Sequence, residues 1–329
     1  MRTLIASDLH LGLPSSRDVL REPRARDALV ERLAAADRVV LLGDLVELLG
    51  TPAPIALECA EPLLTNLAAA LGPNREVIVV PGNHDRALVE TWLDARAEPL
   101  GLEDEVPADS SPELARIVAA LAGPRVRVVY PGVWLRPDVY ATHGHYLDAH
   151  LKPPPPLRLL WPQWNEWLTP PPAGPAGPSD YERALAWAYD GIARQGRRRH
   201  SVDGGSVDRA RRVLTFAGSA LVPGAGDGSA EVSVGLMAAK LRTGGLRAMA
   251  ATVERLEIES EHVIFGHVHR AGPLEGDDPA RWRTPAGTQL HNAGAWIASG
   301  LVRDPDSPYA PGRCVELRDG APPALVRVL

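Results

Sequence analysis

Cysteine is scarce in this sequence, since 329 residues contain only Cys59 and Cys314. Two thiols so far apart exclude a disulfide framework and favour a reducing compartment. Long apolar runs are also lacking, and no stretch reaches the ~18 apolar residues that a membrane span needs. The opening "MRTLIASD" turns charged too early for a signal peptide. We therefore expect a cytoplasmic protein.

An excess of positive charge is the third feature that is missing. The chain has 35 Lys and Arg against 41 Asp and Glu, a formal net charge of −6. This balance argues against general coating of nucleic acid and leaves one basic run, "RQGRRRH" at 194–200, as a local patch. Hydrophobic content of 45% and charged content of 23% are typical of a globular protein with a full core.

Strand and helix patterns alternate along the first half of the chain. Expected strands are followed by helical spacing of apolar residues, which favours an α/β fold with a largely parallel sheet. The expected strands are 2–7, 38–44, 76–85 with its loop, 125–130, 138–145, 261–270, 289–297 and a closing pair that begins at Cys314 and Leu325. The expected helices of this part are 24–36, 55–71 with an interruption at Pro62, and 86–97.

The alternation breaks in the middle of the chain. Residues 151–178 combine proline runs, which block helices and sheet ladders, with Trp161, Trp164 and Trp167. Helical patterns follow at 181–194 and at 229–258, the latter broken at Gly244–Gly245. We interpret residues 147–255 as an inserted, mainly helical cap, with 1–146 and 256–329 forming the core domain.

Residues of the types that bind metals stand at the ends of the expected strands. In "SDLHLG", Asp8 and His10 are two residues apart and so project from the same face of a strand. Ligand sites of open α/β sheets gather at the carboxyl ends of strands, so such clusters are expected to converge. The further candidates are Asp44 in "GD", Asn83, His84 and Asp85 in "GNHD", His143 and His145 in "HGH", and His267 and His269 in "GHVH".

This ordered set of motifs resembles the calcineurin-like metallophosphoesterase family. The resemblance covers residues 8–145 and 261–294, where "HNAG" at 291–294 is similar to the closing turn of the family. It implies a four-layer α/β/β/α sandwich that holds two divalent metal ions. It also implies that Asp8, His10 and His269 hold one ion, that Asn83, His143 and His267 hold the other, and that Asp44 bridges them. His84 would assist the leaving group, and Asp85 would orient His84.

The chemistry of phosphate ester hydrolysis suits such a set. Two cations lower the pKa of a shared water and neutralise the charge on the phosphate oxygens. Nitrogen and oxygen ligands without cysteine favour Mn²⁺, with Fe or Zn²⁺ as alternatives. Glu47 is either an acceptor for a ligand histidine or the start of a helix. His145 is either a substrate contact, a supporting donor or a strand-end histidine.

The substrate is less well defined by the sequence than the reaction. "SDLHLG" and "GDLVE" resemble the branch that contains the UDP-2,3-diacylglucosamine pyrophosphatases, although that branch generally has arginine at the position of His84. The opening motif also resembles double-strand-break repair nucleases, so a nuclease is an alternative. The three tryptophans either pack the cap onto the core, form an apolar lip for a substrate, or contact a membrane surface.

These observations predict a metal-dependent phosphoric ester hydrolase, with a pyrophosphatase as a variant. Its partner would be a small-molecule or lipid-linked phosphate ester. Nucleic acid is the less favoured partner, and a peripheral membrane contact stays open. A function of another class, a non-catalytic interaction scaffold, predicts missing metal ligands, whereas this sequence retains all seven.

Overall fold

The computed structural model divides the chain into two compact units, which are described separately here. The first unit comprises 1–144 and 259–329, and the second comprises 145–258. The structure describes residues 1–13, 17–151, 174–186, 244–298 and 304–329. Trp161, Trp164 and Trp167, the basic run 194–200 and the first half of the expected helical segment 229–258, up to residue 243, lie outside these ranges.

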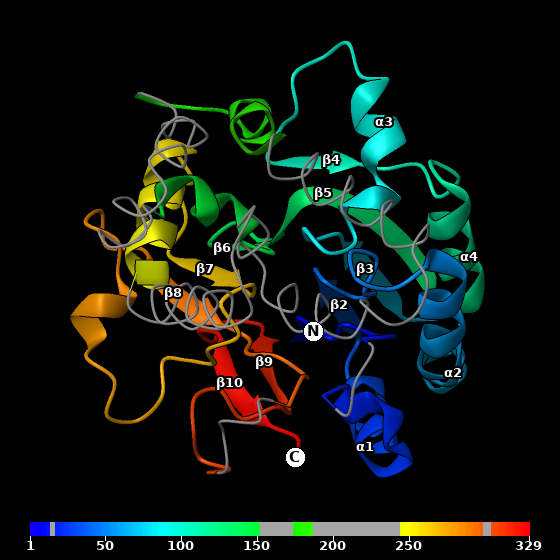
Figure 1. The fold of residues 1–329 in the computed structure, drawn as a ribbon. Helices are drawn as coiled ribbons and strands as arrows, with labels where there is room; N and C mark the ends of the chain where they lie inside the picture. Colours follow the sequence, from blue (N-terminus) through cyan, green and yellow to red (C-terminus); the bar gives the residue numbers. More distant parts are fainter. Residues whose placement is uncertain (14–16, 152–173, 187–243, 299–303) are drawn as a thin grey trace, which may run out of the picture. The chain divides into compact units, whose positions relative to one another are not determined.

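The first unit is built on one long mixed sheet (Figure 1). Its order is β10-β9-β1-β2-β3-β5-β6-β7-β8, with β4 paired to β5. Within it β1, β2, β3 and β5 are parallel, as are β6, β7 and β8, whereas β5 pairs with β6 antiparallel. The strands are β1 (Arg2–Ala6), β2 (Arg38–Leu42), β3 (Glu76–Val80), β4 (Glu103–Glu105), β5 (Arg125–Arg136), β6 (Val139–Thr142), β7 (His262–Phe265), β8 (Gln289–Asn292), β9 (Arg313–Arg318) and β10 (Ala324–Arg327).

Strand β5 serves both halves of the sheet. Its first half pairs with β3, from Arg125 to Val128, and its second half pairs with β6, from Gly132 to Arg136. Two hydrophobic clusters lie on either side of the β1-β2-β3 half. One buries Ile5, Val40 and Ile78 together with Val139 and Ile264 of the other half, so the two halves pack face to face.

The second cluster packs helices onto the opposite face of β1, β2 and β3. Leu29 of α1, Leu63 of α2 and Leu114 of α4 are buried against this face together with Val39 and Val77. The first unit is therefore a mixed α/β sandwich, as the sequence predicts. Its helices are α1 (Pro23–Ala34), α2 (Ala53–Leu71), α3 (Glu90–Asp94) and α4 (Pro112–Ala120), with 3₁₀ turns η1 (Val19–Arg21), η2 (Arg86–Leu88) and η4 (Pro279–Trp282).

Two helix predictions are wrong. Helix α2 runs through Pro62 without interruption. Pro62 lies on the exposed face, where water can bind the carbonyl that loses its partner, while Leu63 and Leu67 hold the buried face. The helix expected over 86–97 is a 3₁₀ turn followed by the short α3, and none of the residues of α3 is buried.

The second unit contains a 3₁₀ helix, η3 (His145–His150), and helices at 178–186 and 244–255. Its described core includes Tyr146 and Tyr181, whose rings are stacked with centroids 5.1 Å apart. The Tyr146 hydroxyl donates to Glu182 at 2.7 Å, and the Tyr181 hydroxyl lies 2.7 Å from His150 Nε2. No helix in the described part of the chain is both long and apolar enough to cross a bilayer.

Candidate metal centre

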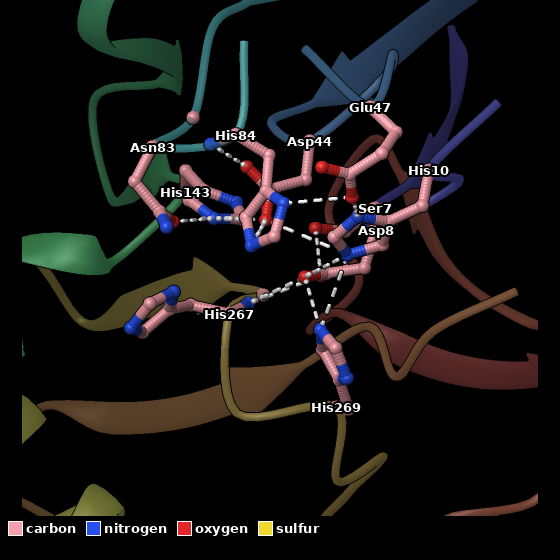
Figure 2. Close-up of polar contacts among 12 residues, drawn as sticks. Ser7, Asp8, His10, Asp44, Glu47, Asn83, His84, His143, His267 and His269 are labelled. Atoms are coloured by element: carbon pink, nitrogen blue, oxygen red, sulfur yellow. Dashed lines mark hydrogen bonds and ion pairs between the residues drawn. The ribbon is translucent and has the colours of Figure 1, made fainter. Parts of the chain in front are cut away.

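The candidate ligands of the first unit follow the carboxyl ends of β1, β2, β3, β6 and β7, where they meet (Figure 2). Four groups of side chains in the described part of the chain have ligand atoms within 4.8 Å of one another, and two of these groups contain Asp44. The first group is Asp8, His10, Asp44 and His269, and the second is Asp44, His143 and His267. Asp44 belongs to both groups, as expected of a carboxylate that bridges two ions.

Asp44 has one carboxylate oxygen committed and one without a hydrogen bond. Oδ1 accepts from the backbone N–H of His84 at 2.8 Å. Oδ2 is buried and makes no hydrogen bond within the described residues. Three ring nitrogens lie around it, with His143 Nε2 at 3.3 Å, His10 Nε2 at 3.5 Å and His84 Nε2 at 4.0 Å. A buried carboxylate oxygen of this kind is costly unless a cation occupies the space beside it.

Two ligand histidines are held so that their Nε2 atoms face this space. Glu47 Oε2 lies 3.2 Å from His10 Nδ1, and the carbonyl of Leu42 lies 3.2 Å from His143 Nδ1. Because a carboxylate and a carbonyl can only accept, each Nδ1 carries a proton, which leaves Nε2 as the atom that can bind a metal. His143 Nε2 is also 3.2 Å from Asn83 Oδ1, which places the amide oxygen beside the second group.

The remaining ligands complete the two groups. His269 Nε2 lies 3.1 Å from Asp8 Oδ1 and 3.3 Å from His10 Nε2. The rings of His143 and His267 meet edge to face, with centroids 5.3 Å apart. Nitrogen and oxygen donors without sulfur fit divalent metals such as Mn²⁺, Fe²⁺ or Zn²⁺. The residues present therefore fit a pair of divalent ions.

Left-handed backbone is concentrated at the ligands. The backbone angle φ lies between 45° and 65°, a region that residues other than glycine seldom adopt, at Asp8, His10, Asp44, His267 and His269. Each such residue costs about 1–3 kcal/mol and persists only where the surroundings determine it. Strained backbone at five ligands indicates that the fold holds the ligand geometry at the expense of stability.

Glycines directly before two ligands make this geometry sterically feasible. A Cβ at Gly43 would lie 2.1 Å from the ring of His143, and Gly43 itself has φ 77°. A Cβ at Gly266 would lie 1.9 Å from Ser7 Oγ and 2.3 Å from Asp8 Oδ2. The "GD" and "GH" pairs of the sequence therefore reflect close packing behind the ligands.

Charge at the site reflects the mixture of buried carboxylates and imidazoles. Burial opposes ionisation of Asp44, but His143 and His84 outweigh it and hold the pKa of Asp44 well below its usual range. Burial also opposes a charge on His84, but Glu47 and Asp44 outweigh it and raise the pKa of His84 to about 10. Burial lowers the pKa of His269, which favours the neutral ring that binds metal.

Metal binding should release protons from the metal-free chain. Burial opposes a charge on His143, but Asp44 and neighbouring carboxylates raise its pKa to about 9. Between pH 7 and 8 this ring is therefore protonated, and because a ligand imidazole must be neutral, metal binding displaces the proton. The apparent metal affinity should rise with pH up to about 9. Calorimetric titrations in two buffers of different ionisation enthalpy measure the release, and heats independent of the buffer would contradict it.

Glu47 takes the position at His84 that the sequence assigns to Asp85. Glu47 Oε2 accepts from His84 Nδ1 at 2.8 Å, while Oε1 accepts from the Gly50 N–H at 2.8 Å. Glu47 lies outside any helix, so its role is that of an acceptor. One oxygen of Glu47 thus contacts both His84 and the candidate ligand His10. Its position three residues after Asp44 is the only signal of this role in the sequence.

The structure corrects the expectation that Asp85 orients His84. The Asp85 carboxylate instead accepts from backbone N–H groups of Gly82 at 2.6 Å, Leu45 at 2.7 Å and Val46 at 3.4 Å. These bonds tie the turn after β3 to the turn after β2, so Asp85 positions the two loops. Burial, with Asp44 nearby, raises the pKa of Asp85 to about 6.

Substituting Asp85 should therefore lower the stability of the fold and not act directly on turnover. Asp85→Ala leaves at least two amide groups buried without an acceptor, and we expect a loss of about 2–4 kcal/mol in the free energy of unfolding. Asp37→Ala is the matched control, because the exposed Asp37 carboxylate accepts one backbone hydrogen bond, from the Arg2 N–H, and its loss should cost under about 1 kcal/mol. Urea denaturation measures both. A stable Asp85→Ala chain with the turnover defect of His84→Ala would restore the original assignment.

Ser7 contacts the candidate ligand Asp8, and His145 belongs to the second unit. Ser7 Oγ lies 2.6 Å from Asp8 Oδ2 and 2.5 Å from the Leu42 carbonyl, a contact that sequence reasoning missed although Ser7 precedes Asp8 in "SDLHLG". His145 is the first residue of η3 in the second unit and is buried, with its ring edge-on to Tyr146 at 4.7 Å. Its role as a substrate contact stays a prediction.

Comparison with known proteins places the chain in a family. The model of the calcineurin-like phosphoesterase family matches residues 1–208, well over half of the chain. The chain belongs to this family. The family and the ligand clusters together indicate divalent metal ions. Among curated proteins no relative matches the sequence.

Solved structures give distant likenesses. A nuclease MPE of Pseudomonas putida is 20% identical with a TM-score of 0.25, over 46% of this chain and 56% of that chain. A cold-active protein-tyrosine phosphatase of a psychrophilic Shewanella species is 13% identical with a TM-score of 0.31, over 97% and 75%. A dimetal phosphatase of Danio rerio is 14% identical with a TM-score of 0.35, over 100% and 99%. Scores this low carry no argument about activity, and the assignment rests on the family model.

Proposed function

We propose that this chain hydrolyses a phosphate ester or pyrophosphate bond at a dinuclear centre of divalent metal ions. The observation that carries the proposal is the buried Asp44 Oδ2, which has no hydrogen bond within the described residues and faces three histidine ring nitrogens. Asp8, His10 and His269 would hold one ion, Asn83, His143 and His267 the other, and Asp44 both. We propose Mn²⁺ as the native metal, with Fe or Zn²⁺ as alternatives.

The chemistry divides between the ions and the protein. When bound, two such ions lower the pKa of a water nucleophile and neutralise charge on the phosphate oxygens. The protein fixes the ligand rings through Glu47 and the Leu42 carbonyl, and it holds the ligand backbones in their left-handed conformations. This preorganisation keeps the ligands in place before substrate arrives.

His84 supplies the proton for the leaving oxygen in this proposal. Its Nδ1–H donates to Glu47, and its Nε2 is directed toward the space beside Asp44 Oδ2. In the metal-free chain the carboxylates around it raise the pKa of His84 and favour the protonated ring, which is the form that a general acid needs. Glu47 acts as a positioning residue for His84.

The substrate class within the proposal is a monoester, a diester or a pyrophosphate. The resemblance of "SDLHLG" and "GDLVE" to the UDP-2,3-diacylglucosamine pyrophosphatase branch supports a small or lipid-linked pyrophosphate. His84 in place of arginine distinguishes this chain from that branch and supports an ester bond whose leaving group needs a proton. The net charge of −6 makes nucleic acid the less favoured substrate.

The test is hydrolysis by metal-stripped protein reloaded with Mn²⁺. The substrates are p-nitrophenyl phosphate as monoester, bis-p-nitrophenyl phosphate as diester, a nucleoside diphosphate sugar as pyrophosphate, and single- and double-stranded DNA. Mn²⁺-dependent turnover of any of the first three, abolished by chelator, supports the proposal, and the ratio of rates defines the class. Turnover of DNA alone would identify a nuclease. Stoichiometric metal binding without turnover of any substrate would favour the scaffold alternative and refute a hydrolase.

A further inference from the structure

The least buried candidate ligand stands beside a side-chain assembly that the metal centre does not include. The His269 side chain is 16% exposed, whereas His10, Asp8, Asp44 and His143 are at most 3% exposed. His269 also has left-handed backbone, with φ 56°. A ligand with less packing around it and an unfavourable backbone needs another source of rigidity.

Arg270, the next residue, has its guanidinium fixed on two sides. It pairs with Asp277 through two hydrogen bonds, one of them from Nη1 to Oδ2 at 3.1 Å, and it lies over the ring of Trp282 at 5.0 Å from the centroid. Paired and stacked guanidinium groups are the most rigid arrangement of this side chain. We call Arg270, Asp277 and Trp282 the arginine brace.

The brace is itself anchored to the fold. Trp282 is 1% exposed, and its carbonyl accepts from the side chain of Gln289 on β8 at 2.9 Å. Asp277 Oδ2 also accepts from the Leu274 N–H at 2.8 Å. A Cβ at Gly272 would lie 2.3 Å from the Trp282 ring, so the chain after Arg270 is in close contact with the same ring. Arg270 therefore connects the residue after a ligand to a buried side chain.

The backbone on both sides of this segment is fixed independently. On one side the His267 N–H donates to Asp8, and on the other Gly272 exchanges backbone bonds with Asn292 at 3.1 and 2.8 Å. Between these two points lies His269, with Arg270 directly after it. The fixed Arg270 side chain therefore restrains the backbone conformation at His269.

We propose that the arginine brace is a positioning element that holds His269 in its ligand conformation and sets the affinity for one of the two metal ions. The inference rests on the proposed dinuclear site, but it concerns metal binding and does not need substrate. Replacing a group that is hydrogen-bonded to a metal ligand commonly changes metal affinity or activity by about 10- to 100-fold. The brace acts instead through the backbone next to His269, and we take the same range as the expected effect. Because its guanidinium pairs with Asp277 and lies over the Trp282 ring, Arg270 is assigned this positioning role.

The test is Mn²⁺ binding by metal-stripped protein, followed through the electron paramagnetic resonance signal of free Mn²⁺. For the wild-type chain we expect two bound ions. In Arg270→Met and in Asp277→Asn, one of the two dissociation constants should rise by about 10- to 100-fold and the other should stay unchanged. Arg270→Lys should give a smaller rise, because lysine keeps the charge but not the paired hydrogen bonds. The double variant should bind no more weakly than the worse single variant.

Arg136→Met is the matched control. Arg136 pairs with Asp138 through Nε at 2.9 Å and Nη2 at 2.7 Å, and its 17% exposed side chain is comparable to the 19% of Arg270. This pair lies at the turn between the end of β5 and the start of β6, away from the carboxyl end of β6 that His143 follows. Arg136→Met should lose stability in a similar way and bind Mn²⁺ like the wild-type chain.

The outcomes separate the two proposals. Unchanged Mn²⁺ binding in Arg270→Met and Asp277→Asn, or an equal loss in Arg136→Met, overturns the brace. A raised KM with unchanged Mn²⁺ binding would also overturn it and make Arg270 a substrate contact. A wild-type chain that binds two Mn²⁺ but hydrolyses no ester refutes the proposed function alone. If Arg270→Met does not fold, as judged by circular dichroism, Asp277→Asn and Arg270→Lys decide the question.

Discussion

Asp44→Asn should reduce the hydrolysis of every substrate by about 10³-fold or more. An amide offers one oxygen where the carboxylate offers two and carries no charge to hold two cations together. The loss of a bridging ligand removes several kcal/mol of charge stabilisation, and each 1.36 kcal/mol corresponds to tenfold in rate. Rates at saturating Mn²⁺, together with metal content after gel filtration, measure the effect.

The expected signature is loss of activity together with loss of metal. We expect Asp44→Asn to retain at most one ion per chain where the wild-type protein retains two. Asp18→Asn is a suitable control, because Asp18 is also a buried carboxylate, yet it caps η1 and accepts from the Leu20 N–H at 3.1 Å. An Asp44→Asn chain with two ions and normal turnover would contradict the bridging role.

His84→Ala should lower kcat by about 10²- to 10⁴-fold while the protein keeps both metal ions. This range is typical of the loss of a general acid. The defect should depend on the leaving group, because p-nitrophenolate leaves without a proton whereas an alkyl alkoxide needs one. We therefore expect a larger defect for an alkyl phosphate than for p-nitrophenyl phosphate. Parallel rate measurements on the two esters, with metal analysis of the same samples, test this.

Glu47→Gln provides the companion measurement for His84. Glutamine preserves the shape of the Glu47 side chain but removes the charge that, with Asp44, favours the protonated His84 ring. We expect a smaller defect of the same kind, again larger for the alkyl ester. A His84→Ala defect equal for both esters would show that His84 does not protonate the leaving group. Loss of metal in His84→Ala would instead make it a ligand.

The positions of the candidate ligands could be predicted from the sequence because a parallel sheet follows simple rules. Apolar runs mark the strands, and parallel strands present their carboxyl ends at one edge, so Asp8, Asp44 and His143 must converge there. The glycine before Asp44 is visible in the sequence for the same reason that the structure requires it, since any side chain would meet His143.

The contacts behind the ligands could not be predicted in this way. The family resemblance implied that Asp85 orients His84, but the Asp85 carboxylate accepts from three backbone N–H groups of two loops. Glu47 contacts His84 from 37 residues away. The continuity of α2 through Pro62 likewise depends on which face of the helix is exposed. Such outcomes depend on distances between loops, which sequence spacing does not encode.

The sequence by itself determined the α/β class and the family, and its motifs supplied the candidate metal ligands, because strand periodicity and residue chemistry are local properties. Only the tertiary structure decided that Glu47 serves His10 and His84 together and that Arg270 is fixed between Asp277 and Trp282. The physical reason is that hydrogen bonds and ion pairs act over about 3–4 Å. Which distant residues come that close is settled by the packing of the whole sheet and its loops.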